Sequence, residues 1–290
     1  MGFTSEEKEL LYILNSVASG ISIIGCAFII IVYFKYKQLQ IFHFRLVLYL
    51  SIIDLLHSVA FLLPTYSGDN NDAVCKLQGT SLTFLTLSSV LWTAMIAFTL
   101  YRGVVNQRAP EDYEYWFLGI ALSVPAAATG LPFITHSYGP AEGWCWIESG
   151  SVGNIWRLSL FYGPLWIVIV FNVWAYFRVI RSINSQFVNI EEEYRAKKQI
   201  VNRLRAYPII LVICFTPVTI NRFYEFLSPD NPNYTLTTVS GILTCLNGLA
   251  NAVVYGFTKT VRDAIRENWS KETPRRTSST FDFMLMSQYE

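Results

Sequence analysis

The sequence contains seven long apolar segments, each with enough residues to cross a bilayer. An α-helix rises about 1.5 Å per residue, so roughly 20 residues span a hydrocarbon core about 30 Å thick. The segments run approximately over Leu10–Phe34, Phe44–Pro64, Lys76–Val105, Tyr115–Ile134, Asn154–Ile180, Ala206–Leu227 and Leu236–Phe257. The pattern predicts an all-α membrane protein, a bundle of seven transmembrane helices.

Composition agrees with a chain that spends most of its length in the lipid bilayer. Hydrophobic residues make up 52% of the sequence and charged residues only 15%, whereas a soluble domain is about 25% charged. The net charge is +1, so a general electrostatic attraction to nucleic acid has no support and no nucleic-acid partner is expected.

The distribution of basic residues predicts the orientation. With the N-terminus outside, the outer side holds only Lys8, Lys76, Arg157 and Arg222, against 18 of the 22 Lys and Arg residues on the other side. Cytoplasmic loops carry such an excess, so the N-terminus is expected outside the cell and the C-terminus in the cytoplasm. The chain then divides into an extracellular N-terminus (1–9), a seven-helix domain (10–258), an amphipathic helix on the inner leaflet (259–269) and a disordered cytoplasmic tail (270–290).

Two features of the outer side fit this orientation. The sequon that begins at Asn233 falls in the last outer loop, where glycosylation can occur. Cys75 and Cys145 both fall at the outer surface, whereas the other three cysteines lie inside helices. A Cys75–Cys145 disulfide is therefore predicted, because only these two share an oxidising compartment. Two free thiols are the alternative.

Polar residues inside the apolar segments are informative because each is costly in hydrocarbon and needs a partner. Asp54 lies deep in the second segment, and Asn247, Asn251 and Tyr255 follow each other at intervals of four on one face of the seventh. We expect this stripe to face Asp54 and to satisfy its hydrogen bonds. It is a hydrogen-bond cluster that holds two helices together, a switch or cation site, or both. His57 lies one turn after Asp54, but the chain has only three histidines and no metal site or cofactor is expected.

Proline in the middle of the sixth segment predicts a movable helix. Pro217 removes one backbone hydrogen bond and creates a kink or pivot. The outer end of the same segment carries Asn221, Arg222 and Glu225.

Arg157 and Trp92 are expected to point into the same outer cavity as this sixth-segment end. Two fixed cations, Arg157 and Arg222, favour a small anionic or polar extracellular ligand over a lipid or an amine. The alternative is that Arg222 pairs with Glu225 and only closes the helix end.

The cytoplasmic side carries most of the charge. Residues 182–205 form the longest inner connection, which is either a solvated helical extension or a docking surface for a partner. Arg102, Arg203 and Arg205 are expected to line a cleft on this inner side. Residues 259–269 place apolar side chains opposite Arg262 and Arg266, which predicts a helix lying on the membrane.

Several short motifs resemble those of the plant G-protein-coupled-receptor-like family, which is related to the slime-mould cyclic AMP receptors. They are Trp144-Cys145-Trp146, Phe161-Tyr162-Gly163-Pro164-Leu165-Trp166, Thr219-Ile220-Asn221-Arg222, Leu91-Trp92-Thr93, Ala97-Phe98-Thr99-Leu100, and Tyr255-Gly256-Phe257 before Val261-Arg262. The resemblance implies a multi-pass plasma-membrane receptor that is not an enzyme, with a cyclic nucleotide as one ligand to consider. It also implies a heterotrimeric G protein as partner, with one of its helices entering the inner cleft lined by Arg102, Arg203 and Arg205. Arg102 follows Tyr101 rather than an acidic residue, and no proline follows Asn251, so the activation details of rhodopsin-like receptors do not carry over.

Other classes of seven-helix protein fit less well. A retinal protein needs a lysine in the seventh segment, and residues 236–257 contain none. A seven-span small-solute transporter is the alternative function, although the sequence has no visible three-helix repeat. Flux of solute in vesicles would distinguish a transporter from a receptor.

Overall fold

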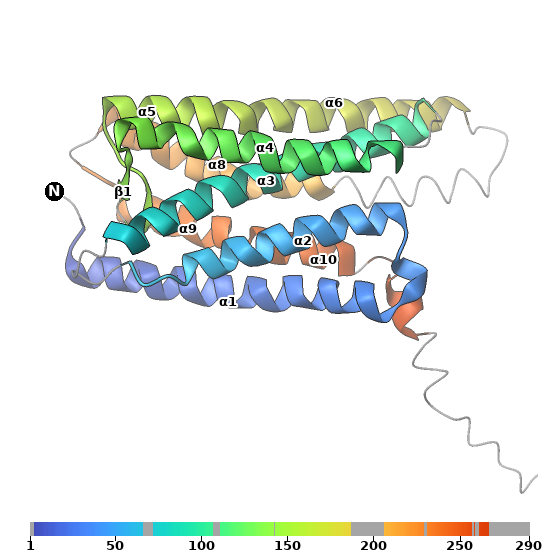
Figure 1. The fold of residues 1–290 in the computed structure, drawn as a ribbon, viewed down its shortest axis with the longest axis horizontal. Helices are drawn as coiled ribbons and strands as arrows, with labels where there is room; N and C mark the ends of the chain where they lie inside the picture. Colours follow the sequence, from blue (N-terminus) through green and yellow to red (C-terminus); the bar gives the residue numbers. More distant parts are fainter. Residues whose placement is uncertain are drawn as a thin grey trace, which may run out of the picture.

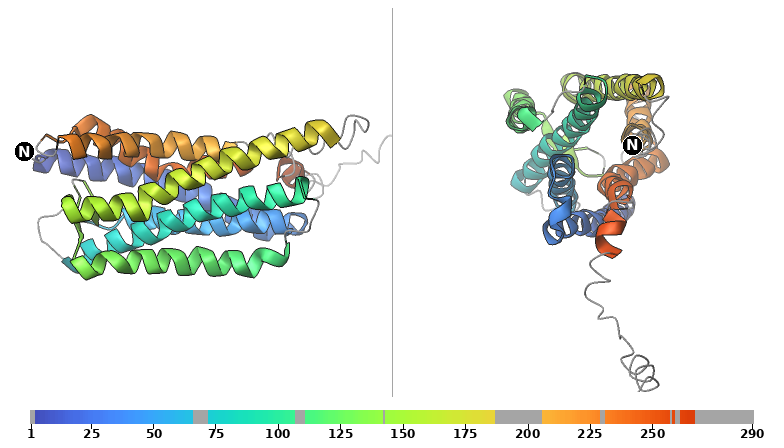
Figure 2. Two further views of the ribbon diagram at one scale, coloured as in Figure 1. Left: turned by 90° about the horizontal axis from the view of Figure 1, so that it is seen from above. Right: turned by 90° about the vertical axis from the view of Figure 1, so that its right-hand side faces the viewer.

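Long helices running side by side make up nearly all of the structure (Figure 1). It is a computed structural model, and it describes residues 3–65, 72–106, 111–141, 143–186, 206–228, 231–256, 258 and 261–266. The long helical elements are α1 (Ser5–Lys35), α2 (Phe42–Phe61), α3 (Asp72–Val104), α4 (Glu114–Gly130), α6 (Gly163–Gln186), α8 (Ala206–Leu227), α9 (Tyr234–Cys245) and α10 (Asn247–Gly256). The end-on view in Figure 2 shows them packed around a common long axis.

Shorter elements join or extend these helices. Single turns η1 (Lys37–Leu39) and η2 (Glu111–Tyr113) precede α2 and α4, and η3 (Leu131–Thr135) extends α4. The fifth span consists of α5 (Ser151–Trp156), a π-helical turn η4 (Arg157–Tyr162) and α6. Strands β1 (Tyr138–Pro140) and β2 (Cys145–Ile147) form an antiparallel hairpin, which the all-α prediction did not include.

Within the described residues, six helices are long and apolar enough to cross a membrane, and a bent helix pair gives a seventh when it is taken as one span. The expectation of an all-helical membrane protein is therefore confirmed for the part of the chain that the structure describes, apart from the hairpin. The expectation of one continuous seventh helix over 236–257 is wrong. α9 ends at Cys245, α10 begins at Asn247, and the two helices are bent by 41°.

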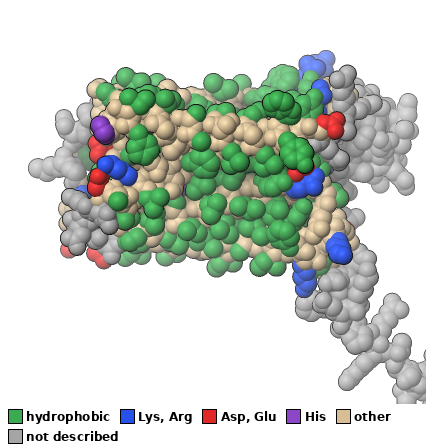
Figure 3. Space-filling view, viewed as in Figure 1, with side chains coloured by type: hydrophobic (Ala, Val, Ile, Leu, Met, Phe, Trp, Pro, Cys, Tyr) green, Lys and Arg blue, Asp and Glu red, His purple; other side chains and the backbone are tan. Residues whose placement is uncertain are grey.

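The surface has the polarity that a bilayer requires. Figure 3 shows hydrophobic side chains over the middle of one face and charged side chains gathered at its two ends. Large apolar residues point outward along the helices, among them Ile24 and Ile167, which are more than two-thirds exposed. Such exposed apolar surface is unfavourable in water and is typical of a lipid-facing bundle.

The third helix is the most enclosed element of the bundle. α3 packs against α2, α4 and α6, and its serine and threonine residues are largely buried. Thr83 and Thr86 donate their hydroxyls to the carbonyls of Gly79 and Leu82 at 2.8 and 2.6 Å. Because these hydrogen bonds lie within α3, the hydroxyls need no partner on another helix. This explains why so many small polar residues are tolerated at the centre of the bundle.

Several predicted features lie partly or wholly outside the described residues. The tail 270–290 and most of the inner connection 187–205 are among them. Of the predicted amphipathic helix, residues 261–266 are described and are helical. Val261 and Ala264 are buried there against Val32 and Leu39.

Candidate functional site

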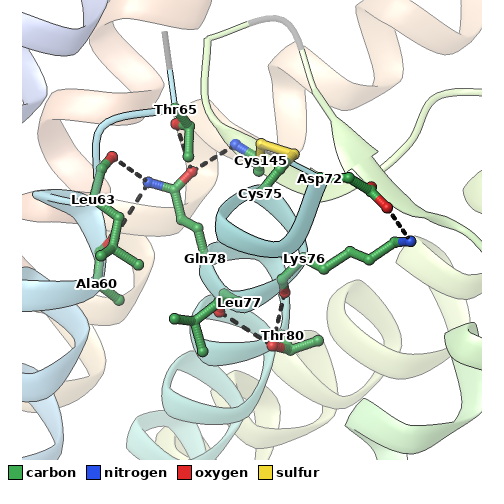
Figure 4. The surroundings of a disulfide bond; sticks show 10 residues. All are labelled: Ala60, Leu63, Thr65, Asp72, Cys75, Lys76, Leu77, Gln78, Thr80 and Cys145. Atoms are coloured by element: carbon green, nitrogen blue, oxygen red, sulfur yellow. Dashed lines mark hydrogen bonds and ion pairs between the residues drawn. A yellow bond between two sulfur atoms is a disulfide. The ribbon is translucent and has the colours of Figure 1, made fainter. Parts of the chain in front are cut away.

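One end of the bundle is covered by the β-hairpin, which a disulfide ties to α3 (Figure 4). Cys75 and Cys145 are bonded, with their Cα atoms 5.2 Å apart and 70 positions apart in sequence. The predicted pairing is confirmed. It fixes β2 over the first turn of α3.

Gln78 is a second connection between α3 and the hairpin, and sequence reasoning missed it. Its amide is only 1% exposed. The Oε1 atom accepts hydrogen bonds from the backbone N of Cys145 at 2.7 Å and from the Thr65 hydroxyl at 3.0 Å. The Nε2 atom donates to the carbonyls of Ala60 and Leu63 at 3.2 and 3.4 Å. A single side chain therefore joins the ends of α2 and α3 to the hairpin.

The hairpin lies directly on the α3 backbone. Trp146 donates its indole N–H to the Thr83 hydroxyl at 3.0 Å. A Cβ atom on Gly79 would come within 3.2 Å of the Trp146 Cα and 3.1 Å of the Tyr138 ring, so glycine permits this approach. The Tyr138 hydroxyl donates to the Thr129 carbonyl at 2.9 Å, and burial raises the pKa of Tyr138 to about 12.

A buried ionic cluster lies beneath the hairpin, formed by the fifth span and α8. Both Arg157 and Arg222 contact the Oε2 atom of Glu225, Arg157 at 3.5 Å and Arg222 more closely. Asn221 donates to the Oε1 atom of Glu225 at 2.8 Å and to the Thr237 hydroxyl at 3.2 Å. Each of these residues is at most 8% exposed. The alternative in which Arg222 pairs with Glu225 is therefore the arrangement seen, and Arg157 shares the same carboxylate.

The two arginines also contact the hairpin. The Nε atom of Arg157 donates to the Ile147 carbonyl at 2.8 Å. Its guanidinium carbon lies 5.4 Å from the centre of the Trp146 ring, and that of Arg222 lies 5.7 Å from the same ring and 5.8 Å from Trp144. All three separations allow cation–π attraction.

A small pocket adjoins this cluster. Its volume is about 40 Å³, and its lining includes His57, Phe61, Trp144, Trp146, Phe215 and Arg222. One water molecule takes up roughly 10–15 Å³ of such a pocket, so there is room for only a few waters. Side chains would have to move before it could admit a ligand of several heavy atoms.

Trp92 lies elsewhere, contrary to the expectation that it shares the outer cavity. It is 1% exposed and packs in an apolar cluster that includes Phe42, Met95, Phe117 and Tyr255. Its ring centre is 5.1 Å from that of Tyr49 on α2. The rotation of α3 about its own axis decides which way Trp92 points. The residues on either side of Trp92 in the sequence are mostly apolar and do not indicate that rotation.

A second buried polar site joins α2, α3 and α10. The Asp54 carboxylate, 3% exposed, accepts hydrogen bonds from the Ser89 hydroxyl at 2.7 Å and from the Asn251 amide at 2.8 Å. Asn247 and Tyr255 are buried on the same helix as Asn251. Within the described part of the chain, the Asn247 Oδ1 atom has no hydrogen-bond partner.

The predicted cytoplasmic site is only partly described. Arg102 donates to the Tyr113 hydroxyl at 2.8 Å and lies 5.2 Å from the centre of its ring. Arg203 and Arg205 lie outside the described residues. Among the described residues, no group of three or more His, Cys, Asp or Glu side chains could hold a metal ion.

The helix arrangement matches a known fold. Squid rhodopsin superposes with a TM-score of 0.75 over 94% of this chain and 88% of that chain, at 14% sequence identity. The protein therefore has the rhodopsin-like fold of seven-transmembrane receptors.

Sequence comparisons define the family. The slime mold cyclic AMP receptor family model matches residues 2–258. G-protein coupled receptor 1 of Arabidopsis thaliana is 32% identical over 285 residues, covering 95% of this chain and 86% of that protein. Cyclic AMP receptor-like protein A of Dictyostelium discoideum is 32% identical over 261 residues, covering 88% of this chain and 66% of that protein. The chain belongs to the slime mold cyclic AMP receptor family and is a multi-pass membrane receptor rather than an enzyme.

Proposed function

We propose that the protein is a plasma-membrane receptor whose N-terminus lies outside the cell. It binds a small polar or anionic extracellular ligand beneath the hairpin and passes the signal to a heterotrimeric G protein through movement of α8. The name of one relative, a G-protein coupled receptor, supports a G protein as partner. The name of another, a cyclic AMP receptor-like protein, supports a small anionic ligand. Cyclic nucleotides are the first ligands to test.

The observation that carries this proposal is the shared carboxylate of Glu225. Arg157 belongs to the fifth span and Glu225 to α8, so their 3.5 Å ion pair links two spans. An anionic ligand that bound the guanidinium groups of Arg157 and Arg222 would compete with Glu225 for them. Binding would weaken the link between the spans and favour a different position of α8.

Two further features fit such a movement. Pro217 lies inside α8, one turn from Asn221, and its missing N–H weakens the helix there. Asp54 joins α2, α3 and α10 through Ser89 and Asn251, so a shift of these helices must rearrange its hydrogen bonds. Asn247 and Tyr255 lie on the same helix and complete the proposed switch network. Arg102, Arg203 and Arg205 are the proposed contacts for the G protein.

The test measures ligand-driven nucleotide exchange on co-expressed G-protein subunits, with cyclic nucleotides and other small anions as ligands. Arg222→Ala should abolish the response, because it removes a guanidinium that holds the ligand. Glu225→Gln should increase the potency of an anionic ligand, because it removes the competing charge while keeping a hydrogen-bond acceptor.

Lys76→Ala is the matched control. Lys76 is a cation at the same end of the bundle, but it pairs with Asp72 at 2.6 Å outside the cluster. Its loss should leave potency unchanged. If Arg222→Ala responds normally at equal surface expression, the arginine cluster is structural and the ligand site is misplaced.

A further inference from the structure

A basic pocket lies at the end of the bundle opposite the hairpin, beside the contact between α3 and α6. Its volume is about 390 Å³, and the described residues that line it are Val105, Arg178, Arg181 and Ser182. Val105 directly follows α3, whose other end carries the disulfide to the hairpin. Figure 3 shows basic side chains at this end of the bundle. In the proposed orientation, the pocket therefore lies at the inner leaflet of the membrane.

The positive charge of this pocket is not balanced by the protein itself. Arg178 and Arg181 are both exposed and lie three positions apart on α6, so they are neighbours on the helix surface. Neither takes part in an ion pair within the described part of the chain, whereas Arg45, Arg157 and Arg222 each contact a carboxylate. The described residues that line the pocket include no Asp or Glu. An anionic ligand would supply the missing negative charge.

Aromatic side chains hold one of the two guanidinium groups in place. The guanidinium carbon of Arg178 lies 5.9 Å from the centre of the Trp174 ring, within the range of cation–π attraction. The Trp174 ring packs in turn on Tyr101 of α3 and Phe171 of α6, with ring centres 5.0 and 5.9 Å apart. Arg178 is therefore positioned by aromatic rings that join the two helices. Such ordering before binding reduces the entropy that is lost when a ligand binds.

The surface next to the pocket has the character of a lipid-facing helix. Val170, Val173, Trp174 and Phe177 precede the two arginines on α6, and these four residues are between 43% and 66% exposed. Large apolar side chains with this exposure belong in hydrocarbon, and tryptophan is enriched where hydrocarbon meets the lipid head groups. The change from apolar to basic residues between Phe177 and Arg178 therefore marks the membrane surface. The pocket lies at the level of the head groups.

The chemistry of the pocket favours a phosphate monoester. A guanidinium group presents a planar fork of N–H donors that matches two phosphate oxygens, and a phosphate monoester carries a charge of about −1.5 to −2. A phosphatidylcholine head group instead carries a cation that the arginines repel. The pocket volume falls within the range of about 300–1,000 Å³ that is typical of small-molecule sites. It therefore has room for a sugar ring together with its phosphate.

We propose that this pocket binds the head group of a phosphoinositide, a lipid with a phosphate monoester on its inositol ring. Arg178 and Arg181 bind the phosphate monoester, and the acyl chains lie along Val173 and Phe177. A lipid fits this place better than a segment of a G protein, because the two arginines continue the lipid-facing side of α6. Basic pockets between helices on the cytoplasmic side are suited to such head groups. The site shares no residue with the proposed ligand site or switch network.

The test titrates the purified full-length receptor in detergent with phosphatidylinositol monophosphate and follows bound lipid by native mass spectrometry. The receptor should bind this lipid in preference to phosphatidylserine and phosphatidylcholine. Arg178→Gln and Arg181→Gln should each weaken binding about tenfold, as expected for one lost charge-assisted hydrogen bond. The water-soluble head group, inositol bisphosphate, should bind more weakly than the lipid because it has no acyl chains to pack on α6.

The matched control removes two cations from the same end of the bundle. Lys35 and Lys37 are exposed and lie outside the pocket, and Lys35 also lies beside an aromatic ring, 5.8 Å from the centre of Tyr36. Lys35→Gln/Lys37→Gln should bind the lipid like the wild type, whereas Arg178→Gln/Arg181→Gln, with the same change in charge, should not.

Several results would overturn the proposal. Equal weakening by the two double variants would show that only the general charge of this end attracts the lipid. Equal binding of phosphatidylserine, or binding of inositol bisphosphate as tight as that of the lipid, would show that no phosphoinositide site exists. Arginine variants that bind the lipid normally but fail in nucleotide exchange would assign Arg178 and Arg181 to the G protein.

Discussion

The Oε1 atom of Gln78 accepts a hydrogen bond from the backbone N of Cys145 at 2.7 Å. The same β2 residue is bonded through its sulfur to Cys75, one turn before Gln78 on α3. The hairpin is therefore attached twice at one point, once covalently and once through a buried amide.

Gln78→Met should destabilise the receptor even when the disulfide is intact. The substitution keeps the length of the side chain but leaves the Cys145 N–H and the Ala60 carbonyl without their partner, which costs about 1–3 kcal/mol for each buried group. Thermal unfolding in detergent, with and without reductant, measures the effect. Gln38→Met, at an exposed position, is the control. Equal melting temperatures for both variants would show that the Gln78 amide adds nothing to the stability of the receptor.

Asp54→Asn should reach the cell surface but alter basal or ligand-driven nucleotide exchange. The amide has the same shape as the carboxylate, yet its NH₂ group cannot accept a bond from Ser89 or Asn251. Ser89→Ala, which removes one of the two bonds, should have a smaller effect in the same assay. Ser88→Ala is the matched control, because Ser88 donates to the Ala121 carbonyl instead. Normal signalling by Asp54→Asn at wild-type surface levels would remove Asp54 from the proposed switch.

Gly248→Ala should be destabilising by about 1–3 kcal/mol, the usual cost of overpacking. Its Cβ atom would lie 2.6 Å from the Ser22 hydroxyl oxygen and 3.0 Å from the Asp54 Cβ. Gly119→Ala meets nothing within 4 Å and should be neutral or slightly stabilising through helix propensity. Comparison of the two melting temperatures tests how tightly α10 packs on α1 and α2. Similar values would mean that α10 is loosely held.

The Asn233 sequon tests both orientation and helix capping. Asn233 is the N-cap of α9, and its side chain accepts a bond from the Leu236 N–H at 3.0 Å. Thr235→Ala should abolish glycosylation, seen as a loss of the glycosidase-sensitive mobility shift, without affecting the cap. Asn233→Ala should remove the glycan and also lower stability by about 1 kcal/mol, the typical cost of a lost N-cap.

A wild-type receptor from eukaryotic cells that carries no glycan at Asn233 would contradict the first part of this prediction. Equal stability of the unglycosylated Thr235→Ala and Asn233→Ala proteins would contradict the second part.

Sequence reasoning located features that depend on residue type and spacing along one helix. Segment length and hydropathy identified the spans, and compartment identified the Cys75–Cys145 pair. Asp54 was selected because a charge is costly to bury in hydrocarbon. Asn251 was placed on a polar face of the seventh span because Asn247, Asn251 and Tyr255 are four residues apart. The predicted contact between the Asp54 and Asn251 side chains is present as a hydrogen bond.

Features that depend on how the helices rotate and pack could not be predicted from the sequence. Trp92 was assigned to the outer cavity, but the rotation of α3 turns it toward Tyr49. The break between Cys245 and Asn247 has no proline to mark it. Gln78 looked like an ordinary polar residue near a helix end, and its role depends on carbonyl groups that only the folded chain brings together.

The double attachment of the hairpin has a consequence for biosynthesis. Cys145 is made 70 residues after Cys75, with the whole fourth span between them. In the proposed orientation, Gln78 lacks its hairpin partner until that span has entered the membrane and Cys145 has reached an oxidising compartment. The hairpin end of α3 stays uncovered until then. Closure of this end is therefore a late step in synthesis. Cells that are slow to form disulfides should hold newly made receptor in the endoplasmic reticulum, fully inserted but not yet exported.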